Sequence, residues 1–239
     1  MKKLVFYFLL VVALLSVGGC TSIEIIVPEK DKNEQNDKTD KGDDENNESN
    51  DKTDKGDDEN NEGAEVINIP DPVFFSYCLD HFDRNKDGQI SKSEVAGVSF
   101  LSLNKEKIQS LEGIAYFAAL EKLYCDENQL TSLDVSGCTA LKTLFCYENQ
   151  LTSLDVSGYT ALEKLFCYEN QLTSLDVSGC TALEKLSCSN NQLTSLDVSG
   201  CTALETLDCS PNPIEIIYMK RGQEIDIPID YQRFIVYVD

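Results

Sequence analysis

The residues best suited to chemistry lie in one twelve-residue stretch between positions 83 and 94. Oxygen-bearing side chains recur there at alternate positions and again at the end: Asp83, Asn85, Asp87, Gln89, Ser91 and Glu94. Calcium takes about six to eight oxygen ligands around a tight turn. Gly88 stands in the middle, where a sharp bend needs a residue without a Cβ. We therefore expect this stretch to bind Ca²⁺.

The spacing resembles the loop of the EF-hand at every defining position. In that resemblance Gln89 contributes its backbone carbonyl, Ser91 a direct or water-bridged contact and Glu94 two oxygens. Sensor EF-hands usually come in pairs, whereas no second loop of this kind is visible in the sequence. We therefore expect a structural ion in constant occupancy. An Asp-rich turn without metal is the alternative.

Helices should flank this loop. Apolar residues follow Pro72 at helical spacing: Phe74, Phe75, Cys78, Leu79 and Phe82. The outgoing helix, from about Ser93 to Val98, should be short. The single histidine, His81, falls outside the ligand positions, and we expect it on the helix surface. Segment 70–100 is therefore predicted to be a small helical cap.

A 21-residue unit dominates the rest of the chain. Its copies open at Leu120, Leu141, Leu162, Leu183 and Leu204. Their shared pattern is L-x-x-L-x-C-x-x-N-x-L-x-x-L-D-V-x-x-C-x-x, whose second half nearly repeats the first. A fixed period of this size indicates a solenoid. We expect two short strands per coil, around Leu123–Cys125 and Leu133–Val135 in the first coil, with alternate residues pointing inward.

This pattern resembles the leucine-rich repeat, and specifically its 21-residue bacterial class. The resemblance implies a mainly β solenoid over segment 101–217, because a degenerate unit from Leu101 precedes the copies and residues 204–217 close the array. The chain departs from the family pattern in two places. Cysteine replaces leucine at the sixth position, and cysteine or tyrosine replaces the second asparagine.

One asparagine per coil should form a ladder that satisfies backbone groups at each turn: Asn128, Asn149, Asn170 and Asn191. The last unit has Asn212 followed by a proline, so the regular coil should end there. The tail alternates like two strands, with Ile225, Ile227 and Ile229 in one and Phe234, Val236 and Val238 in the other. We expect segment 218–239 to form a β cap over the open end.

Five cysteines recur once per coil and should stack as a column: Cys125, Cys146, Cys167, Cys188 and Cys209. All of them would point into the core in the same environment. We therefore interpret them as small packing groups rather than as disulfide partners or ligands of a metal cluster. Cys180 and Cys201 lie one coil apart and could pair, while Cys138 faces Tyr159 in the next coil.

On the first strand, the residues that flank the inward leucine and cysteine should face solvent. They form two columns, Tyr124, Phe145 and Phe166 in one and Asp126, Tyr147 and Tyr168 in the next. A charged rim would surround them: Glu127, Glu148 and Glu169 with Lys122, Lys164 and Lys185. Contiguous exposed rings often mark a binding site for protein or sugar, so we predict that the five aromatic residues bind a partner. The alternative is that they only stack to stabilise strand pairing.

The second strand shows a column of aspartates, which we interpret as turn caps rather than as an ion-binding row: Asp134, Asp155, Asp176 and Asp197. Catalysis would need a nucleophile, a base or a metal in a pocket, and the repeats offer none. The sequence has one histidine and no phosphate-binding or dinucleotide-binding fingerprint. We therefore predict that the chain is not an enzyme. A glycosidase pair of carboxylates from different coils is a distant alternative.

The N-terminal segment indicates export and anchoring. Lys2 and Lys3 precede an apolar run that ends in two glycines and Cys20, so segment 1–20 resembles a lipoprotein signal peptide with a lipobox. The resemblance implies acylation of Cys20 and contact with the membrane through this anchor only. An ordinary cleaved signal is the alternative. Segment 21–69, in which a twelve-residue acidic unit occurs twice, is predicted to be a disordered acidic tether.

Charge and the order of these parts indicate where the protein acts. A formal net charge of -22 over 239 residues argues against nucleic acid as a partner. Lipobox, tether, calcium loop and repeats, in this order, resemble surface lipoproteins of Gram-negative bacteria. That resemblance implies a surface-exposed outer-membrane location and a role in recognition or adhesion. The expected partner is a protein on another cell or host surface, with carbohydrate capture as the second hypothesis.

Overall fold

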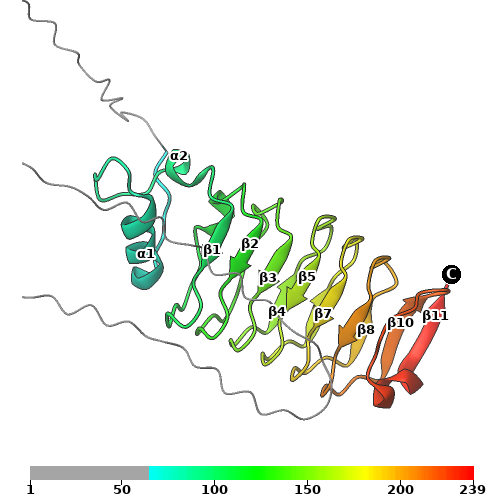
Figure 1. Cartoon of the computed structure of the whole chain (residues 1–239). Coiled ribbons are helices and arrows are strands. Elements are labelled where there is room, and N and C mark those ends of the chain that lie inside the picture. The colour runs from blue at the N-terminus through cyan, green and yellow to red at the C-terminus, as the bar shows by residue number, and fades with distance from the viewer. Residues whose placement is uncertain (1–64) are drawn as a thin grey trace, which may run out of the picture. The chain divides into compact units, whose positions relative to one another are not determined.

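The computed structural model describes residues 65–239, in which a helical cap precedes a row of stacked coils (Figure 1). Helix α1 (Pro72–Phe82) begins where the sequence predicts, because one carboxylate oxygen of Asp71 accepts the amides two and three residues further on, at 2.9 and 3.0 Å. The other oxygen accepts the amides of Gln109 and Ser110 at 2.8 and 3.1 Å. A single carboxylate thus ties the cap to the first coil.

The second helix of the cap, α2 (Lys92–Val95), is shorter than predicted. Residues 65–69, which the sequence assigned to the tether, are among the described residues, and Ile67 and Ile69 are buried in the core. The lipidation site, Cys20, lies outside the described residues. Within residues 65–239, no helix is long and apolar enough to cross a bilayer.

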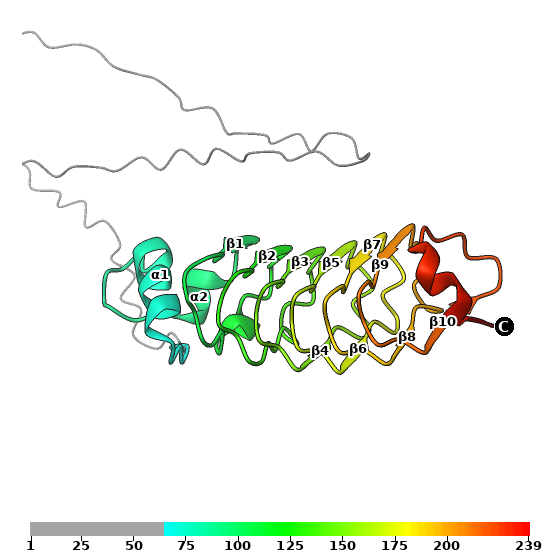
Figure 2. The same ribbon diagram turned by 90° about the horizontal axis from the view of Figure 1, so that it is seen from below.

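Six short strands stack in parallel and in register along one side of the coils (Figure 2). They are β1 (Phe100–Ser102), β2 (Lys122–Tyr124), β3 (Thr143–Phe145), β5 (Lys164–Phe166), β7 (Lys185–Ser187) and β9 (Thr206–Asp208). The central leucine of each strand pairs with that of the next, from Leu101 to Leu207. The predicted mainly β solenoid is therefore confirmed, with strands that begin one residue earlier than expected.

The opposite side of the coils is paired only in parts. Strand β4 (Ser153–Asp155) pairs with β6 (Ser174–Asp176), and β8 (Ser195–Asp197) pairs with β10 (Ile216–Lys220). The strand predicted around Leu133–Val135 is wrong, since residues 132–135 have no regular structure. A strand needs a hydrogen-bonded neighbour. The Tyr159 side chain lies between this segment and β4, and its hydroxyl donates to the Val135 carbonyl.

Leucine, valine and cysteine side chains fill the interior of each coil. In the coil that starts at residue 141, six inward side chains are at most 3% exposed: Leu141, Leu144, Cys146, Leu151, Leu154 and Val156. The complete burial of one leucine side chain contributes about 1.5–3 kcal/mol. Burial of these stacked apolar columns is therefore the main force that holds the coils together.

The predicted asparagine ladder is confirmed. The side-chain oxygen of Asn149 accepts the Leu130 amide at 3.0 Å, and its side-chain amide donates to the carbonyls of Cys125 and Cys146 at 3.0 and 3.1 Å. Asn212 makes the equivalent three bonds in the last unit. The ladder therefore extends to Asn212, near which the regular coil is predicted to end, because it uses a side chain and carbonyls that the following proline does not remove.

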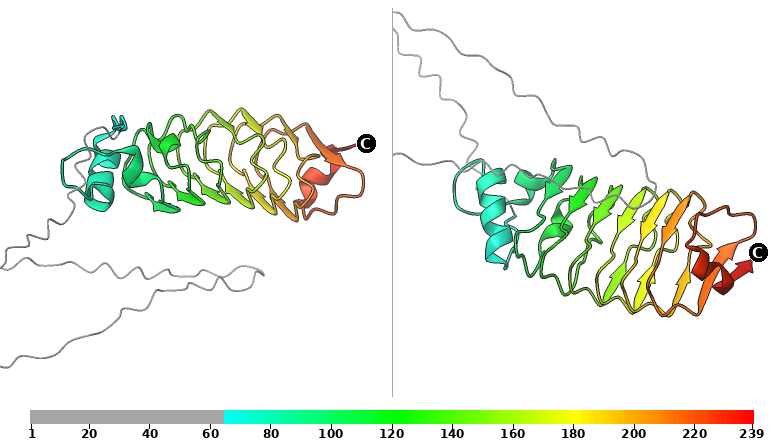
Figure 3. Two further views of the ribbon diagram at one scale, coloured as in Figure 1. Left: turned by 90° about the horizontal axis from the view of Figure 1, so that it is seen from above. Right: turned by 60° about the horizontal axis from the view of Figure 1, so that its bottom comes forward.

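The C-terminal tail covers the end of the solenoid with mixed structure (Figure 3). The second predicted strand forms as β11 (Ile235–Val238), parallel to β10. The first does not: only an isolated bridge joins Asp226 to Thr206 before a 3-10 helix, η2 (Ile229–Phe234). The chain turns into η2 at Ile229, which leaves this side chain 80% exposed. Tyr231 of η2 is buried instead.

Candidate recognition surface

Aromatic rings form a continuous patch on the six-stranded sheet. The rings of Tyr124, Phe145 and Phe166 stack in parallel with 4.7 Å between successive centroids, and the rings of Tyr147 and Tyr168 stack at 4.4 Å. These separations match the spacing of neighbouring parallel strands, about 4.8 Å, because equivalent residues of successive coils lie in register. Each of the five rings is half-buried. We call these five rings, together with Phe100, the aromatic band.

The rings meet the structural requirement of each interpretation, and binding of a partner stays a prediction. Stacking along the strands is present, and none of the five rings is removed from solvent. One member of the predicted columns is wrong, because Asp126 is only 3% exposed. Its carboxylate and the Tyr147 hydroxyl lie close enough to interact. Burial raises the pKa of Asp126 above its usual value, although the interaction with Tyr147 opposes this shift.

Phe100 extends the band by one coil, and the sequence reasoning missed it. Its ring meets the edge of the Tyr124 ring at a centroid distance of 5.2 Å, and the residue is 50% exposed. Phe100 pairs in register with Lys122 and not with Tyr124. It therefore occupies the outward position before the central leucine of its strand, whereas Tyr124 occupies the one after it. The available signal was an aromatic residue directly before Leu101, the first inward residue of the degenerate unit.

A row of glutamates borders the band. The backbone is left-handed at three residues, with φ of 54°, 51° and 52° at Glu127, Glu148 and Glu169. Their amides donate to carbonyls of the next coil, those of Tyr147, Tyr168 and Ser189 respectively. Partial burial, followed by repulsion from Glu127 and Glu169, raises the pKa of Glu148. Lys105 forms an ion pair with Glu127 at 2.8 Å. The predicted charged rim is therefore present on this side, with a concentrated negative charge.

The aspartates of the second strand cap turns, as predicted. Asp134, Asp155, Asp176 and Asp197 each accept the amide of the serine two residues further on, at 2.8–2.9 Å. These bonds lower the pKa of Asp134 and Asp155. His81 lies on the exposed surface of α1, where its ring stacks on Tyr77 at 4.1 Å. Its setting therefore differs from that of a catalytic base in a pocket.

Carboxylates within the predicted calcium loop accept its backbone amides. Asp83 accepts the amides of Asp87 and Gly88 at 3.2 and 3.1 Å, and Asp87 accepts the Gln89 amide at 2.8 Å. Gly88 has a φ of 79°, which the tight turn requires. Asn85 accepts the same Asp87 amide at 3.0 Å. The loop therefore gathers oxygen donors of the kind that suits Ca²⁺.

Glu94 joins the two ends of this loop. It is 6% exposed, and its two oxygens accept the amides of Arg84 and Ser91, both at 2.9 Å, and the Ser91 hydroxyl at 2.8 Å. Burial raises the pKa of Glu94, but these hydrogen bonds outweigh it and lower the pKa overall. In the described part of the chain, no three histidine, cysteine or acidic side chains converge closely enough to hold a metal ion. Calcium binding stays a prediction.

Comparison with known proteins defines the repeat. A family model of leucine-rich repeats, in two copies, matches residues 118–159, 160–198 and 181–218. Residues 118–218 are leucine-rich repeats. None of the curated proteins compared with the chain matches it.

Two solved structures resemble these leucine-rich repeats and their flanks. The functional domain of InlJ from Listeria monocytogenes, which includes a cysteine ladder, is 30% identical with a TM-score of 0.58 over 74% of this chain and 43% of that one. The internalin InlF from Listeria monocytogenes is 22% identical with a TM-score of 0.51 over 73% of this chain and 57% of that one, which shows the fold alone. This chain thus spans about half the length of either.

The leucine-rich repeats of this chain also stack one buried cysteine per coil. All nine cysteines among the described residues are free and buried, so Cys180 and Cys201 do not pair. Instead their thiols donate to the carbonyls of Val156 and Val177 at 3.1 and 3.5 Å. Burial raises the pKa of the Cys180 thiol to about 11 and that of Cys201 to about 12. The column of Cys125, Cys146, Cys167, Cys188 and Cys209 is buried and free, which agrees with the prediction that these five pack the core.

Proposed function

We propose that the leucine-rich repeats recognise a protein on another cell or on a host surface through the aromatic band. The observation that carries this proposal is the contiguous stack of half-exposed rings over β1, β2, β3 and β5. Aromatic residues are enriched at protein interfaces, and a few of them usually supply most of the binding energy. The stacking holds each ring in place before a partner arrives, which reduces the entropy lost on binding.

The charge around the band favours one kind of partner. The glutamate row borders the rings on one side, and the pKa of Glu148 is raised by partial burial and then by repulsion from Glu127 and Glu169. A partner that brings lysine or arginine side chains to this row, beside an apolar centre, would relieve this repulsion. Nucleic acid would add further negative charge, so it is a poor partner.

We further propose that the repeats are displayed at the cell surface. Cys20 at the end of the signal peptide would carry the acyl anchor, and the acidic segment that follows would hold the domain away from the outer membrane. Replacement of Cys20 by alanine should abolish labelling with a fatty-acid analogue and release the protein from the membrane fraction.

We also propose that the loop from Asp83 to Glu94 holds a structural Ca²⁺. Its oxygen donors and its bend at Gly88 support this assignment. The loop is braced from outside, since the Ile67 amide donates to the Ile90 carbonyl at 2.8 Å and the Lys92 amide to the Glu65 carbonyl at 2.9 Å. Such bracing favours a structural ion over a switch.

The recognition hypothesis is tested with arrays. The full chain, labelled, is applied to arrays of host cell-surface proteins and of glycans, together with Tyr147→Ala, Tyr168→Ala and the double variant. Tyr237→Ala is the matched control, because Tyr237 is 51% exposed but lies on β11, outside the band. We expect protein spots that weaken at least tenfold in the double variant and persist in the control. Signals restricted to glycans would favour carbohydrate capture, and equal binding by all variants would exclude the aromatic band.

A further inference from the structure

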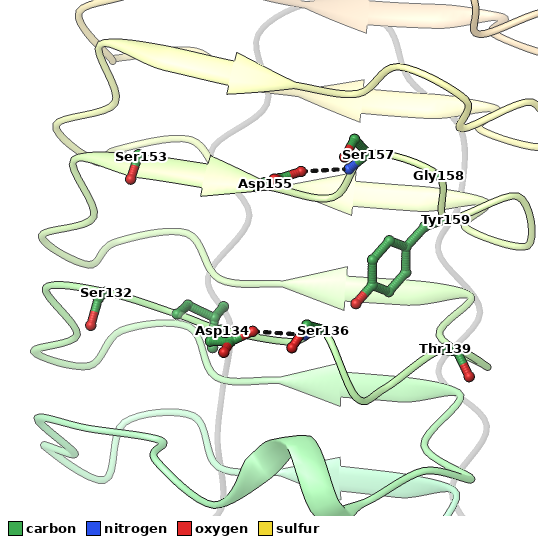
Figure 4. Close-up of a pocket in the computed structure, with 10 residues that line it drawn as sticks. Ser132, Asp134, Ser136, Thr139, Ser153, Asp155, Ser157, Gly158 and Tyr159 are labelled. Atoms are coloured by element: carbon green, nitrogen blue, oxygen red, sulfur yellow. Dashed lines mark hydrogen bonds between the residues drawn. The ribbon is translucent and has the colours of Figure 1, made fainter.

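A cavity of about 620 Å³ opens between residues 132–139 and residues 153–159 (Figure 4). It lies over the second strand of the coils, on the side opposite the six-stranded sheet and the aromatic band (Figure 2). This volume falls in the range of small-molecule sites, about 300–1,000 Å³. We call it the Tyr159 cleft, because the ring of that residue lies between its two walls.

Tyr159 occupies a position that is cysteine in the neighbouring coils. The thiols of Cys138 and Cys180 donate to a carbonyl 24 residues earlier, Ile114 and Val156, at 3.3 and 3.1 Å. The Tyr159 hydroxyl donates to Val135, which is also 24 residues earlier. The tyrosine therefore keeps the bond between coils while it places an aromatic ring where the other coils have a small buried thiol.

The neighbouring coils show what this ring changes. Between β4 and β6 the backbones pair in register, and the Gly158 amide donates to the Ser178 carbonyl at 2.6 Å. Between residues 132–134 and β4 there is no such ladder. Strands β6 and β8 are likewise not paired with each other, but the side chain at the equivalent position there is the buried Cys201. An aromatic surface beside unpaired backbone is thus the distinguishing feature of the Tyr159 cleft.

The walls of the cleft carry acceptors and hydroxyl groups. Asp134 and Asp155 each use an oxygen to accept the amide of the following serine turn, at 2.9 Å, and an ionised carboxylate can accept about four hydrogen bonds in total. Five serine or threonine hydroxyls line the same space. None of these described lining residues is basic, so the cleft does not suit phosphate, sulfate or acidic sugars.

We propose that the Tyr159 cleft binds a neutral saccharide. The Tyr159 ring would pack on the C–H face of one sugar ring, and Asp134 and Asp155 would accept its hydroxyls in charge-assisted hydrogen bonds. Carboxylates with hydroxyls and an aromatic face match a polyol better than a divalent cation, since the described residues line the cleft with only two carboxylates, Asp134 and Asp155. This second site is independent of the aromatic band.

The test uses the full chain and four neutral probes: maltotetraose, cellotetraose, xylotetraose and chitotetraose. Affinity is measured by isothermal titration calorimetry. We expect one of them to bind with a Kd in the micromolar to millimolar range. Tyr159→Cys, which restores the residue of the neighbouring coils, and Asp155→Asn should each weaken binding at least tenfold. Asp197→Asn, the equivalent aspartate outside the cleft, and Tyr147→Ala, in the aromatic band, should stay within twofold of the wild type.

Several results would overturn the proposal: no heat with any of the four probes, unchanged affinity in Tyr159→Cys, or equal loss in Asp197→Asn. Loss in Tyr147→Ala alone would instead assign the sugar to the aromatic band. Circular dichroism checks that each variant is folded. If Tyr159→Cys does not fold, Asp155→Asn decides, because a loss of at least tenfold supports the proposal and unchanged affinity refutes it. Absence of sugar binding together with tetralysine binding that Asp155→Asn weakens would also refute it.

Discussion

Asn170 lies in the middle of the asparagine ladder, and its replacement by alanine should be among the most destabilising polar substitutions in the chain. Its side-chain oxygen is the partner of the Leu151 amide at 2.9 Å, in the interior. Its side-chain amide donates to the carbonyls of Cys146 and Cys167 at 3.0 and 3.1 Å. Each of these carbonyls also accepts from a second asparagine, Asn149 or Asn191.

The magnitude follows from this sharing. Only the Leu151 amide loses its single partner, and an unsatisfied buried donor costs about 1–3 kcal/mol. The two carbonyls each keep one bond and lose one, which adds about 0.5–1 kcal/mol apiece. We therefore expect Asn170→Ala to lower the free energy of unfolding by about 2–5 kcal/mol. Asn170→Asp should be at least as harmful at pH 7, because it retains the acceptor but turns an oxygen toward two carbonyl oxygens.

The assay is urea unfolding of the reduced chain, followed by far-ultraviolet circular dichroism. Asn68→Ala is the control, since Asn68 is exposed and makes one hydrogen bond, to the exposed Glu112 at 3.0 Å. That variant should stay within about 0.5 kcal/mol of the wild type. A loss below about 1 kcal/mol in Asn170→Ala, or a wild-type stability in Asn170→Asp, would refute the view that the ladder holds the coils together.

Three further predictions concern the core, the thiols and the loop. A Cβ at Gly137 would overlap the backbone of Ala115, whereas the nearest contact of a Cβ at Gly200 is 3.5 Å. Gly137→Ala should therefore lower the free energy of unfolding in urea by about 1–3 kcal/mol, and Gly200→Ala should change it little. Equal effects of the two substitutions would contradict this difference in packing. Burial raises the pKa of the Cys138 thiol from 9.0 to about 12. The stability that the buried thiol contributes is therefore fully present below pH 9 and is lost as the pH rises toward 12. Each such thiol should cost about 1.4 kcal/mol of stability at pH 10, and unfolding midpoints that match at pH 8 and pH 10 would contradict this. Millimolar Ca²⁺ should raise the thermal midpoint of the wild type and of Glu215→Gln but not of Glu94→Gln, as followed by circular dichroism; no rise in the wild type would remove calcium from the proposal.

The repeat part of the fold was predictable because its signals are local and recur. The position of every inward leucine follows from a fixed period, and one asparagine per unit has only one role that satisfies the buried backbone, as Asn149 shows. Stacked rings followed from the same argument, since identical spacing places Tyr147 beside Tyr168. The amino-acid sequence by itself is therefore sufficient to identify the repeats.

What could not be predicted depends on single contacts between distant residues. The sequence does not reveal that Tyr231 would accept the Asn212 amide at 2.8 Å and donate to its carbonyl, or that Asp71 would reach Ser110. It also does not reveal that Asp126 would be buried. Alternation alone predicted a strand at Ile225–Ile229, but the chain turns there into η2, which leads to β11.

Because equivalent residues lie in register from Leu101 to Leu207, the upper and lower faces of each coil are nearly interchangeable. Loss or gain of one whole 21-residue unit would join an existing upper face to an existing lower face and create no new kind of joint. Unequal recombination within the gene can therefore lengthen or shorten the row of rings in whole steps. The length of this surface can therefore change during evolution while the fold of each coil stays the same.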